Sequence, residues 1–441
     1  MKILVIDPKC VSVDWCMRAQ NDGHQIKLWS KPGEKTKYVG RGLVPKVSSW
    51  QDHARWADMV FLADNTLWLR DLDTWRARGV PIFGPTDELA DLEMDRSKGQ
   101  EVLKKHGIAT LPQKDFKRYD DAIAYVKKEM KRFVSKPSGD ADKALSYVAK
   151  SPADMVYMLE RWKRMSKLKG EFLLQDFTPG CEMAVGAFFG PGGFNQGWCE
   201  NWEFKKLMNG DCGPNTGEQG TVLRFVRKSL LADKVLKPLE SYLEAHGYVG
   251  YIDVNCIIDE DGTPWPLEFT CRPGWPTFNI QQSLLVGDHA EWMMKTIKGE
   301  DPKCFRMDET AVGVVLTIPD YPYSHLTRHE VIGIPIYGIK PSITSFLHPC
   351  EVMAGMAPMQ VGNKIETKPM YVTAGDYIMV CSGTGSTILQ AKEQAYRVLK
   401  NIEIPNSPMY RTDIGNRLKK QLPQIQSLGY ATGLQWSAAS T

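Results

Sequence analysis

The spacing of apolar runs near the start of the chain constrains its fold more than any other feature. Short apolar runs at Lys2–Ile6, Gln25–Trp29, Met59–Ala63 and Val80–Gly84 each have the length of one strand, and residues 13–21 can form a helix. Runs that are apolar at consecutive positions are typical of parallel strands buried on both faces. Strands that alternate with helices predict a small doubly wound α/β domain, to which we assign residues 1–92.

The remaining chain is long enough for further domains, because 441 residues exceed what one small core usually holds. Helix and strand patterns alternate between residues 110 and 185 and predict a compact α+β lobe within a middle domain, residues 93–308. An amphipathic helix is expected over 230–246, kinked at Pro238, and another helix over 286–298.

The last part of the chain has the pattern of a third α/β unit, residues 309–441. It carries apolar strands at 311–318 and 371–381 and a helical pattern at 386–399. The tail after Ser427 is rich in Gly, Ala and Ser, so we expect it to be loosely held.

Composition limits the classes of function. The hydrophobic fraction of 43%, the charged fraction of 24% and the net charge of +3 are those of an ordinary globular protein. Near balance of charge gives no indication of a nucleic-acid partner. The ten cysteines have no CxxC pairs, and no apolar run approaches the ~20 residues of a membrane span. We therefore expect a cytosolic protein.

Two segments are richest in groups that could carry chemistry. The stretch Asp211–Gly220 reads DCGPNTGEQG, and it predicts a turn-rich loop that presents backbone N–H groups and short polar side chains to an anion. The stretch Leu267–Arg272 reads LEFTCR, and it predicts a strand with a carboxylate, a hydroxyl and a guanidinium at alternate positions. Together they indicate chemistry on a phosphate or an acyl phosphate.

Lys136 ends a predicted strand and precedes a loop of small residues that contains Lys143. Two ammonium groups and loop amides could hold a triphosphate. The segment has a single Gly and is no Walker motif, so a surface turn with solvated lysines is the simpler interpretation of these residues alone.

Carboxylates on neighbouring strands suggest a metal site. Asp253 and Asn255 share one face of a strand, and Glu268 and Thr270 share one face of its hairpin partner. Oxygen ligands of this kind suit Mg²⁺, but a polar, solvent-facing sheet would show the same pattern. Arg272 could clamp a phosphate or carboxylate, or could form a structural salt bridge.

The order of several motifs resembles that of the phosphoribosylamine–glycine ligase family of the ATP-grasp superfamily. Besides the GPNTG and LEFTCR stretches, the segments GVPIFGPT at 79–86, AVGVVL at 311–316 and RTDIG at 411–415 are similar to family segments. The resemblance implies an ATP-grasp fold with an N-terminal Rossmann-like domain, two lobes that hold ATP and a C-terminal α/β domain. It covers nearly the whole chain.

The resemblance also implies an activity. A carboxylate attacks the γ-phosphate of ATP in the presence of Mg²⁺ or Mn²⁺, and an amine then displaces phosphate from the acyl phosphate to form an amide. In the family, glycine and phosphoribosylamine are joined in purine biosynthesis. The implied partners are small amino-acid and amine substrates, without nucleic acid or membrane, in a monomer or dimer.

The resemblance implies the site residues, although Thr270 replaces a family asparagine and Asp253 stands where other ATP-grasp ligases, and not this family, carry a metal ligand. ATP binding falls to Arg96, Lys136, Lys143, Gln175, Asp176, Phe177 and Glu182; catalysis to Lys205, Asn215, Thr216 and Arg272; and the metal to Asp253, Glu268 and Thr270. In this assignment Gln175–Phe177 reads adenine through backbone groups, and residues 213–217 lie beside the acyl group.

The chain departs from the family at the end that would hold the amine. The first strand is followed by residues 7–14, DPKCVSVD, which lack the family's glycine-rich phosphate loop. After Arg272 two acids are lost and the aromatic residues Trp275 and Phe278 appear. Two alternatives therefore stand beside the family reaction: the same ligase chemistry on another amine, such as a modified nucleotide or nucleobase, and a scaffold that binds without catalysing.

Overall fold

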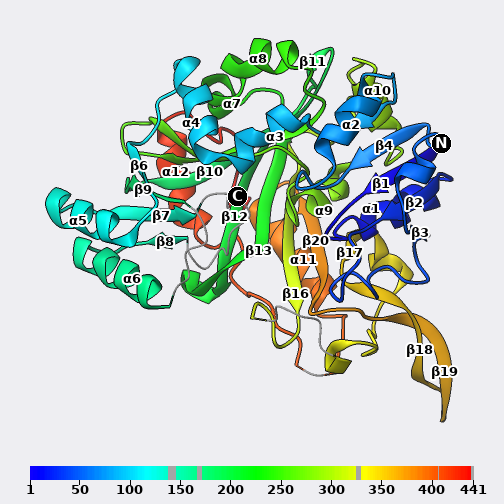
Figure 1. Cartoon of the computed structure of the whole chain (residues 1–441). Helices are drawn as coiled ribbons and strands as arrows, with labels where there is room; N and C mark the ends of the chain where they lie inside the picture. Colours follow the sequence, from blue (N-terminus) through cyan, green and yellow to red (C-terminus); the bar gives the residue numbers. More distant parts are fainter. Residues whose placement is uncertain (138–145, 166–170, 324–328, 406, 439–441) are drawn as a thin grey trace.

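The computed structural model describes residues 1–137, 146–165, 171–323, 329–405 and 407–438. These residues form an N-terminal parallel sheet, a small antiparallel lobe, a large antiparallel sheet and a projecting two-stranded hairpin (Figure 1). Lys143 lies outside the described residues. In the described part of the chain, no helix combines the length and the apolar character needed to cross a membrane.

The N-terminal sheet has the strand order β3-β2-β1-β4-β5, and its neighbouring strands are parallel. Its strands are β1 (Lys2–Ile6), β2 (Gln25–Trp29), β3 (Lys46–Val47), β4 (Met59–Leu62) and β5 (Ile82–Phe83), with helices α1 (Val13–Asn21) and α2 (Leu69–Arg76). The predicted doubly wound fold is confirmed. The carboxyl ends of β1 and β4 lie together, so the loops that follow them, starting at Asp7 and Ala63, meet at one edge.

The small lobe is a four-stranded sheet of order β6-β9-β7-β8. It consists of β6 (Gln113–Phe116), β7 (Phe133–Pro137), β8 (Tyr147–Val148) and β9 (Phe172–Asp176), with α5 (Tyr119–Glu129) and α6 (Pro152–Arg164). Residues from both helices and from the sheet form a core of their own. Strands β7 and β9 are antiparallel and pair Lys136 with Leu173.

The large sheet has the order β15-β14-β10-β12-β13-β16-β20-β17, and the short β11 pairs with β10. Its strands are β10 (Cys181–Gly190), β11 (Gly193–Phe194), β12 (Trp198–Met208), β13 (Cys212–Val226), β14 (Gly250–Ile258), β15 (Pro264–Thr270), β16 (Thr310–Thr317), β17 (Leu347–Pro349) and β20 (Tyr377–Gly385). Pairing of β13 with β16 carries hydrogen bonding across residue 308, where we place a domain boundary. The domain division therefore remains a proposal.

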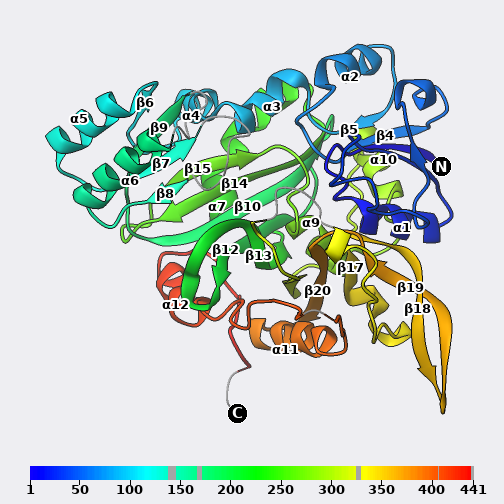
Figure 2. The same ribbon diagram turned by 60° about the horizontal axis from the view of Figure 1, so that its bottom comes forward.

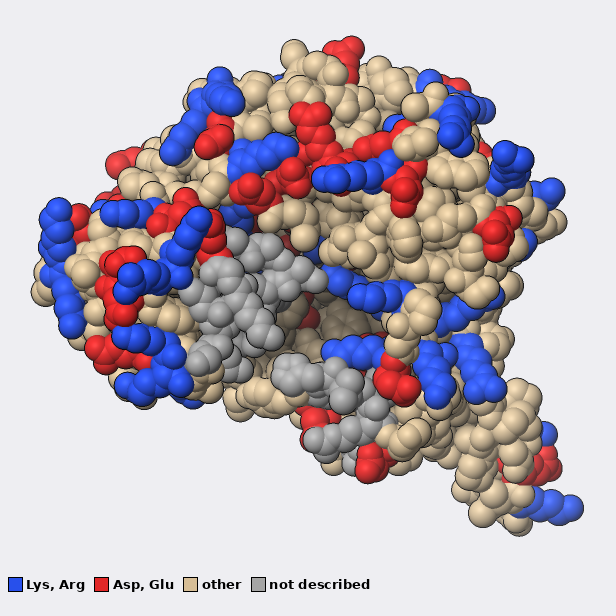
Figure 3. Space-filling view, viewed as in Figure 1, with Lys and Arg blue, Asp and Glu red and all other residues tan. Residues whose placement is uncertain are grey.

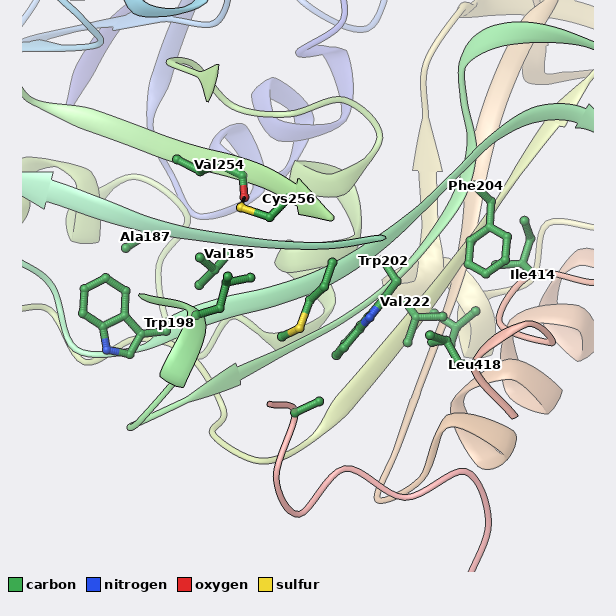
Figure 4. Packing of buried hydrophobic residues seen from close by; sticks show 14 of the residues in the cluster. Val185, Ala187, Trp198, Trp202, Phe204, Val222, Val254, Cys256, Ile414 and Leu418 are labelled. Carbon is green, nitrogen blue, oxygen red and sulfur yellow. Dashed lines mark hydrogen bonds between the residues drawn. The ribbon is translucent and has the colours of Figure 1, made fainter. Parts of the chain in front are cut away.

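Alternation along β12 separates an apolar face from a polar one. Trp202 and Phe204 are 1% exposed and pack with residues such as Val222 of β13 and Leu418 in the core drawn in Figure 4. Glu203 and Lys205 point to the opposite face, because successive side chains of a strand alternate. The same alternation places Glu182 of β10, Asn255 of β14 and Glu268 of β15 on the polar face.

Helices α3 (Asp87–Met94) and α4 (Arg96–Lys105) link the N-terminal sheet to the lobe. The helix predicted over 230–246 is broken into α7 (Leu230–Val235), a 3₁₀ turn at Lys237–Leu239 and α8 (Glu240–Ala245), as expected around Pro238. Two short helices, α9 (Thr277–Gln281) and α10 (Glu291–Ile297), follow β15.

The helix predicted from residue 286 begins later than expected. Asp288 accepts hydrogen bonds from the backbone amides of Ala290 and Glu291, each at 2.8 Å, and α10 starts at Glu291. Residues 286–290 therefore form the helix entry and not its first turn.

The strand predicted at 371–381 is two strands. The first, β19 (Lys364–Thr373), pairs with β18 (Val352–Val361) in a hairpin that projects from the body in Figures 1 and 2. The second is β20. Glu351 accepts hydrogen bonds from the amides of Asp376 and Tyr377 and so fixes the turn between them. Such a distant partner is invisible in the local pattern.

The prediction of a loose tail is wrong. After α11 (Ile388–Leu399) and α12 (Leu418–Ser427), Tyr430 is fully buried and Leu434 is 4% exposed. The amide of Ile388 donates to the carbonyl of Gln435 at 3.0 Å. Packing against the large sheet therefore orders a segment whose composition alone favours disorder.

Candidate active site

A cavity of about 430 Å³ lies between the small lobe and the polar face of the large sheet. Its lining combines residues of β7 and β9 with residues of β10, β12, β13 and β15. Figure 3 shows a hollow in the middle of this face with basic side chains along its border. A second cavity of about 180 Å³ adjoins it and shares Arg96, Lys205 and Glu268 with its lining.

Three cationic side chains, those of Arg96, Lys136 and Lys205, meet at the junction of the two cavities. Arg96, at the start of α4, lies 2.9 Å from Glu268, and Lys136 donates to the carbonyl of Leu267 at 3.2 Å. Burial, together with the neighbouring Arg96, lowers the pKa of Lys136 to about 7. A polyphosphate placed here would restore the charged form of this lysine, because an anion favours the ammonium ion.

Lys205 lies among three carboxylates. Its Nζ is 2.9 Å from Glu203, 3.3 Å from Glu268 and 3.5 Å from Glu182. Burial lowers the pKa of Lys205, but the three carboxylates outweigh burial and hold that pKa well above its usual value. The cluster brings together three predicted residues, Lys205, Glu268 and Glu182, with Glu203, which was not predicted.

The structure separates the predicted metal ligands into two positions. Register pairs Asn255 with Glu268 and pairs Asp253 with Thr270. Asp253 lies outside the lining of both cavities, and its carboxylate accepts from Asn201 at 2.8 Å and from Tyr251 at 3.0 Å. Burial, with nearby Glu203, raises the pKa of Asp253 to about 7.

Asn255, opposite Glu268, offers a further oxygen for a metal. Its Nδ2 donates to Glu182 at 2.8 Å, and its Oδ1 has no hydrogen-bond partner among the described residues. An amide oxygen beside carboxylates is a ligand set that suits Mg²⁺. Across the described ranges, no group of three or more His, Cys, Asp or Glu residues forms a metal site by itself. Asn255, which like Asp253 lies outside the lining of both cavities, is therefore a candidate ligand beside Asp253.

The predicted adenine-binding segment lines the larger cavity. Gln175, Asp176 and Phe177 all belong to its lining. The amides of Asp176 and Phe177 donate to the carbonyls of Pro112 and Arg132, so they are engaged within the lobe. The ring of Phe177 also stacks on the Arg132 guanidinium, 3.5 Å from its centroid. Recognition of a base by this segment would therefore depend on its carbonyl oxygens and on the side chain of Gln175.

The stretch 211–220 is not the loop that its Gly, Pro and Asn residues predict. It is the first part of β13, and Asn215 pairs with Lys206 where the register with β12 shifts. Thr216 donates to the carbonyl of Lys205 at 2.8 Å, and Asn215 donates to the carbonyl of Ser146 at 3.0 Å. Both residues line the larger cavity.

The RTDIG motif explains why this hairpin holds its shape. Arg411, 1% exposed, contacts Asp211 at 2.9 Å and donates to the carbonyl of Lys206 at 3.0 Å. Asp413 accepts from the amide of Gly210 at 2.8 Å. Two motifs that lie 200 residues apart in the sequence thus form one structural unit beside the cavity.

The smaller cavity extends from Glu268 toward the edge of the N-terminal sheet. Arg272 lines it and contacts Glu93 at 3.1 Å, so the predicted clamp is paired within the chain. Trp275 also lines it, whereas Phe278 is 1% exposed in the core and is not accessible for stacking. Asn65, Glu93 and Glu218 complete this end, and none of the three was predicted.

Two signals in the sequence, strand alternation and position at the sheet edge, could have revealed some of the missed residues. Glu203 shares a face with Lys205 by the period of two. Asn65 follows β4 at the edge where doubly wound sheets bind ligands. Arg417 lines the larger cavity and donates to the carbonyl of Glu203, but it lies in the C-terminal segment, and no local pattern indicates its position.

Comparison with known proteins shows which enzymes the chain is similar to. Residues 95–277 match the family model described as phosphoribosylglycinamide synthetase, ATP-grasp (A) domain. The phosphoribosylamine–glycine ligase of Salmonella typhimurium is 25% identical over 404 residues, covering 88% of this chain and 89% of that protein. The chain is similar to phosphoribosylamine–glycine ligases along most of its length, and residues 95–277 carry their ATP-grasp domain. It is an enzyme, an ATP-grasp ligase that forms carbon–nitrogen bonds.

Other relatives agree in fold. The phosphoribosylamine–glycine ligase of Ralstonia nicotianae is 27% identical over 358 residues, covering 78% of this chain and 81% of its own length. The crystal structure of a phosphoribosylamine–glycine ligase from Thermotoga maritima superposes with a TM-score of 0.69 at 20% identity, covering 94% of this chain and all of that one. N5-carboxyaminoimidazole ribonucleotide synthetase from the same organism gives a TM-score of 0.58 at 15% identity, with 92% and 99% covered.

Proposed function

We propose that the chain joins a small carboxylic acid to an amine at the expense of ATP, with an acyl phosphate as the intermediate. One observation supports this most directly: Arg96, Lys136 and Lys205 converge on Glu268 where the two cavities meet. A triphosphate in the larger cavity would direct its γ-phosphate to this point. A carboxylate in the smaller cavity would lie beside it.

The chain's own residues would act by positioning and by neutralising charge. In the first step a carboxylate oxygen attacks the γ-phosphorus, the bond to the β-phosphate oxygen breaks, and ADP leaves. Lys136 and Arg96 would balance the negative charge on the transferred group. In the second step the amine nitrogen attacks the carbonyl carbon. The bond from that carbon to the phosphate oxygen breaks, and phosphate leaves with the electron pair while nitrogen loses a proton.

A divalent metal fits the oxygen-rich side of this junction. Glu268 and Asn255 would hold it, and Glu182 and Glu203 lie close enough to support them. The unpartnered Oδ1 of Asn255 supports this assignment. When bound, Mg²⁺ or Mn²⁺ would neutralise phosphate charge and orient the phosphates. Thr270, which lines the smaller cavity, is closer to the acid than to this group of oxygens.

The base and sugar of ATP would lie in the larger cavity. Gln175 would contact the base, and Phe177 stacked on Arg132 would form one wall. Glu182 would face the ribose or its metal-bound phosphates. Asn215 and Thr216 would hold the acyl group through the β12–β13 hairpin.

The relatives are named for phosphoribosylamine and glycine, so glycine is the first acid to test. A place in purine biosynthesis would follow if phosphoribosylamine is also the amine. The scaffold alternative has little support, because the predicted cations and acids converge in one accessible site and the family consists of ligases.

Positional isotope exchange tests the first step without any amine. ATP labelled with ¹⁸O in the β–γ bridge is incubated with enzyme, Mg²⁺ and glycine or another small acid. Acid-dependent scrambling of the label into non-bridging positions is expected, because acyl-phosphate formation is reversible. Absence of scrambling with every acid, despite ATP binding measured by calorimetry, would contradict the proposal.

A further inference from the structure

The amine end of the site differs from an anion-binding site in its first loop. Asp7 follows β1 directly and is fully buried. Its carboxylate accepts from the amide and the hydroxyl of Ser12, at 2.7 and 2.6 Å, and from the amide of Lys9 at 3.1 Å. These donors stand at the N-terminus of α1, where a phosphate would otherwise bind. The chain's own carboxylate occupies them.

A second acid reinforces the negative character of this helix terminus. Asp14, in the first turn of α1, is 2% exposed and accepts from Arg18 and from Gln282. Burial raises the pKa of Asp7, whereas Arg18 and His348 hold the pKa of Asp14 near 2 against burial. An external anion would therefore have to displace the Asp7 carboxylate to reach the amides of Lys9 and Ser12, and it would lie near Asp14, which is paired with Arg18.

The cations of the smaller cavity are paired within the chain. Lys9 contacts Asp64 at 3.1 Å, and Arg272 contacts Glu93 at 3.1 Å. The cavity lining holds four cations (Lys9, Arg96, Lys205 and Arg272) and four carboxylates (Glu93, Glu203, Glu218 and Glu268). Asp64 lies behind Lys9 as a further acid. Arg96 and Lys205 also line the larger cavity. At the other end of the smaller cavity, the outer end, Lys9 and Arg272 are balanced by Asp64 and Glu93, so this end has no excess positive charge.

One buried polar atom at the outer end has an unmet hydrogen bond. Asn65 is 1% exposed and lines the smaller cavity. Its Nδ2 donates to Glu93 at 2.9 Å, which leaves Oδ1 as an acceptor without a partner among the described residues. A buried acceptor of this kind is costly unless a ligand donates to it. An amine or ammonium group is such a donor.

We propose that the acceptor of this ligase is a small amine without a phosphate group, held by hydrogen bonding to Asn65 in an acid-rich pocket. The cavity of about 180 Å³ is below the usual ~300 Å³ of sites for larger ligands, in keeping with a compact acceptor. Trp275 provides one apolar wall. This inference rests on the proposed ligase function and specifies its second substrate.

A matched set of amines tests the inference. With an acid that passes the isotope-exchange test, amine-dependent ADP release is measured for ethanolamine, 1,4-diaminobutane and ammonia, and for O-phosphoethanolamine and phosphoribosylamine. We expect turnover with at least one unphosphorylated amine and kcat/KM at least tenfold lower for the phosphorylated ones. Better turnover with a phosphorylated amine would overturn the inference, as would no turnover with any unphosphorylated amine. Isotope exchange would persist in either case, so the ligase proposal would stand.

Substitution of Lys9 should change the KM for the amine in opposite directions for an unphosphorylated and a phosphorylated acceptor. The side chain of Lys9 is 47% exposed, so Lys9→Met should fold normally. Removing this cation leaves Asp64 uncompensated, and the KM for the active amine should fall two- to fivefold at low salt. If the pocket holds a phosphate, the same variant should raise KM. An unchanged or raised KM counts against the proposal.

Asn65 tests the hydrogen bond itself. Asn65→Leu should raise the KM for the amine at least tenfold, a larger change than in the rate of acid-dependent isotope exchange. Asn401→Leu, on the surface far from both cavities, serves as the matched control. Equal loss of isotope exchange and amine turnover would indicate a structural role, and an unchanged KM would also overturn the assignment.

Discussion

Single residues on the polar face of the large sheet decide what the site can do. Glu268 contacts Arg96 and Lys205, and register places Asn255 opposite it on β14. Asp253, two residues earlier, shares the face but is enclosed by Asn201 and Tyr251. One step along a strand face therefore separates Asn255, which contacts the carboxylates of Glu182 and Glu203, from Asp253, which is bonded to Asn201 and Tyr251.

Glu268→Ala should abolish ADP formation while the fold persists. Loss of a residue that supports a metal ligand already costs 10–100-fold in many enzymes, so loss of a ligand should lower kcat by about 100-fold or more. ADP release measures the effect, and a thermal melt checks the fold. The exposed Glu366→Ala is the control. Near-normal turnover in Glu268→Ala would show that the metal assignment is wrong.

Substitutions of Asn255 and Asp253 should differ in their effect on the Mg²⁺ requirement. Asn255→Leu removes a proposed metal ligand, and the Mg²⁺ concentration needed for half-maximal ADP release should rise about tenfold or more. Asp253→Asn keeps an oxygen that can accept from Asn201 and Tyr251, so this requirement should stay within about twofold of wild type. The reverse pattern would restore Asp253 as the ligand.

At the scale of elements, the site depends on the β12–β13 hairpin and on the contacts that fix it. Gly210 and Asp211 adopt positive φ values of 68° and 54° at its turn, and Arg411 fixes Asp211 from the C-terminal segment. The turn between β19 and β20 is fixed in a similar way by Glu351. Both devices use a charged group from a distant part of the chain.

Glu351 should make stability fall as pH rises. Burial raises its pKa to about 7 from the usual 4.5. Between these values the folded state keeps a proton that the unfolded state has released, so the stabilisation present below pH 4.5 is lost as pH rises to 7. Glu351→Gln should remove this dependence and stabilise the protein at pH 8 by roughly 1–3 kcal/mol. Urea unfolding at pH 5 and pH 8 measures it; a pH slope unchanged by the substitution would argue against it.

Local patterns predicted the elements well and the site only in part. Strands such as β1 and helices such as α6 follow from runs and periods that lie within one segment. The GPNTG stretch was wrongly predicted as a loop, because its pairing with β12 outweighs its turn-forming residues. Arg417 could not be assigned, since it gains its position from contacts between distant segments. Asp7 shows the same limit: a missing glycine was visible, but the carboxylate that fills the turn was not.

At the scale of the whole molecule, a buried polar network joins the N-terminal sheet to the C-terminal part. Asp14 accepts from His348 Nδ1 at 2.8 Å, and His348 Nε2 lies 2.9 Å from the Ser382 hydroxyl. Burial lowers the pKa of His348, so the neutral ring uses one nitrogen as donor and the other as acceptor. The N-terminal edge of the smaller cavity is thereby held against the large sheet.

Asp14→Ala should lower the free energy of unfolding but should affect ADP release little. It leaves Arg18 and His348 buried without their carboxylate, which should cost roughly 3–5 kcal/mol. Denaturant unfolding measures this loss, and Asp261→Ala, in an exposed turn, should change little. ADP release at a temperature well below the melt should persist. A loss under about 1 kcal/mol would mean that the network contributes little.

The packed C-terminal tail has a consequence for how the enzyme is made. Arg411 and Arg417, which fix the β12–β13 hairpin, and Tyr430, which closes the core, are synthesised after the last strand of the large sheet. A nascent chain that already contains both sheets therefore still lacks the contacts that shape the floor of its ATP cavity. We expect a premature stop codon after residue 400 to yield a protein that proteases remove, and not a weakened ligase.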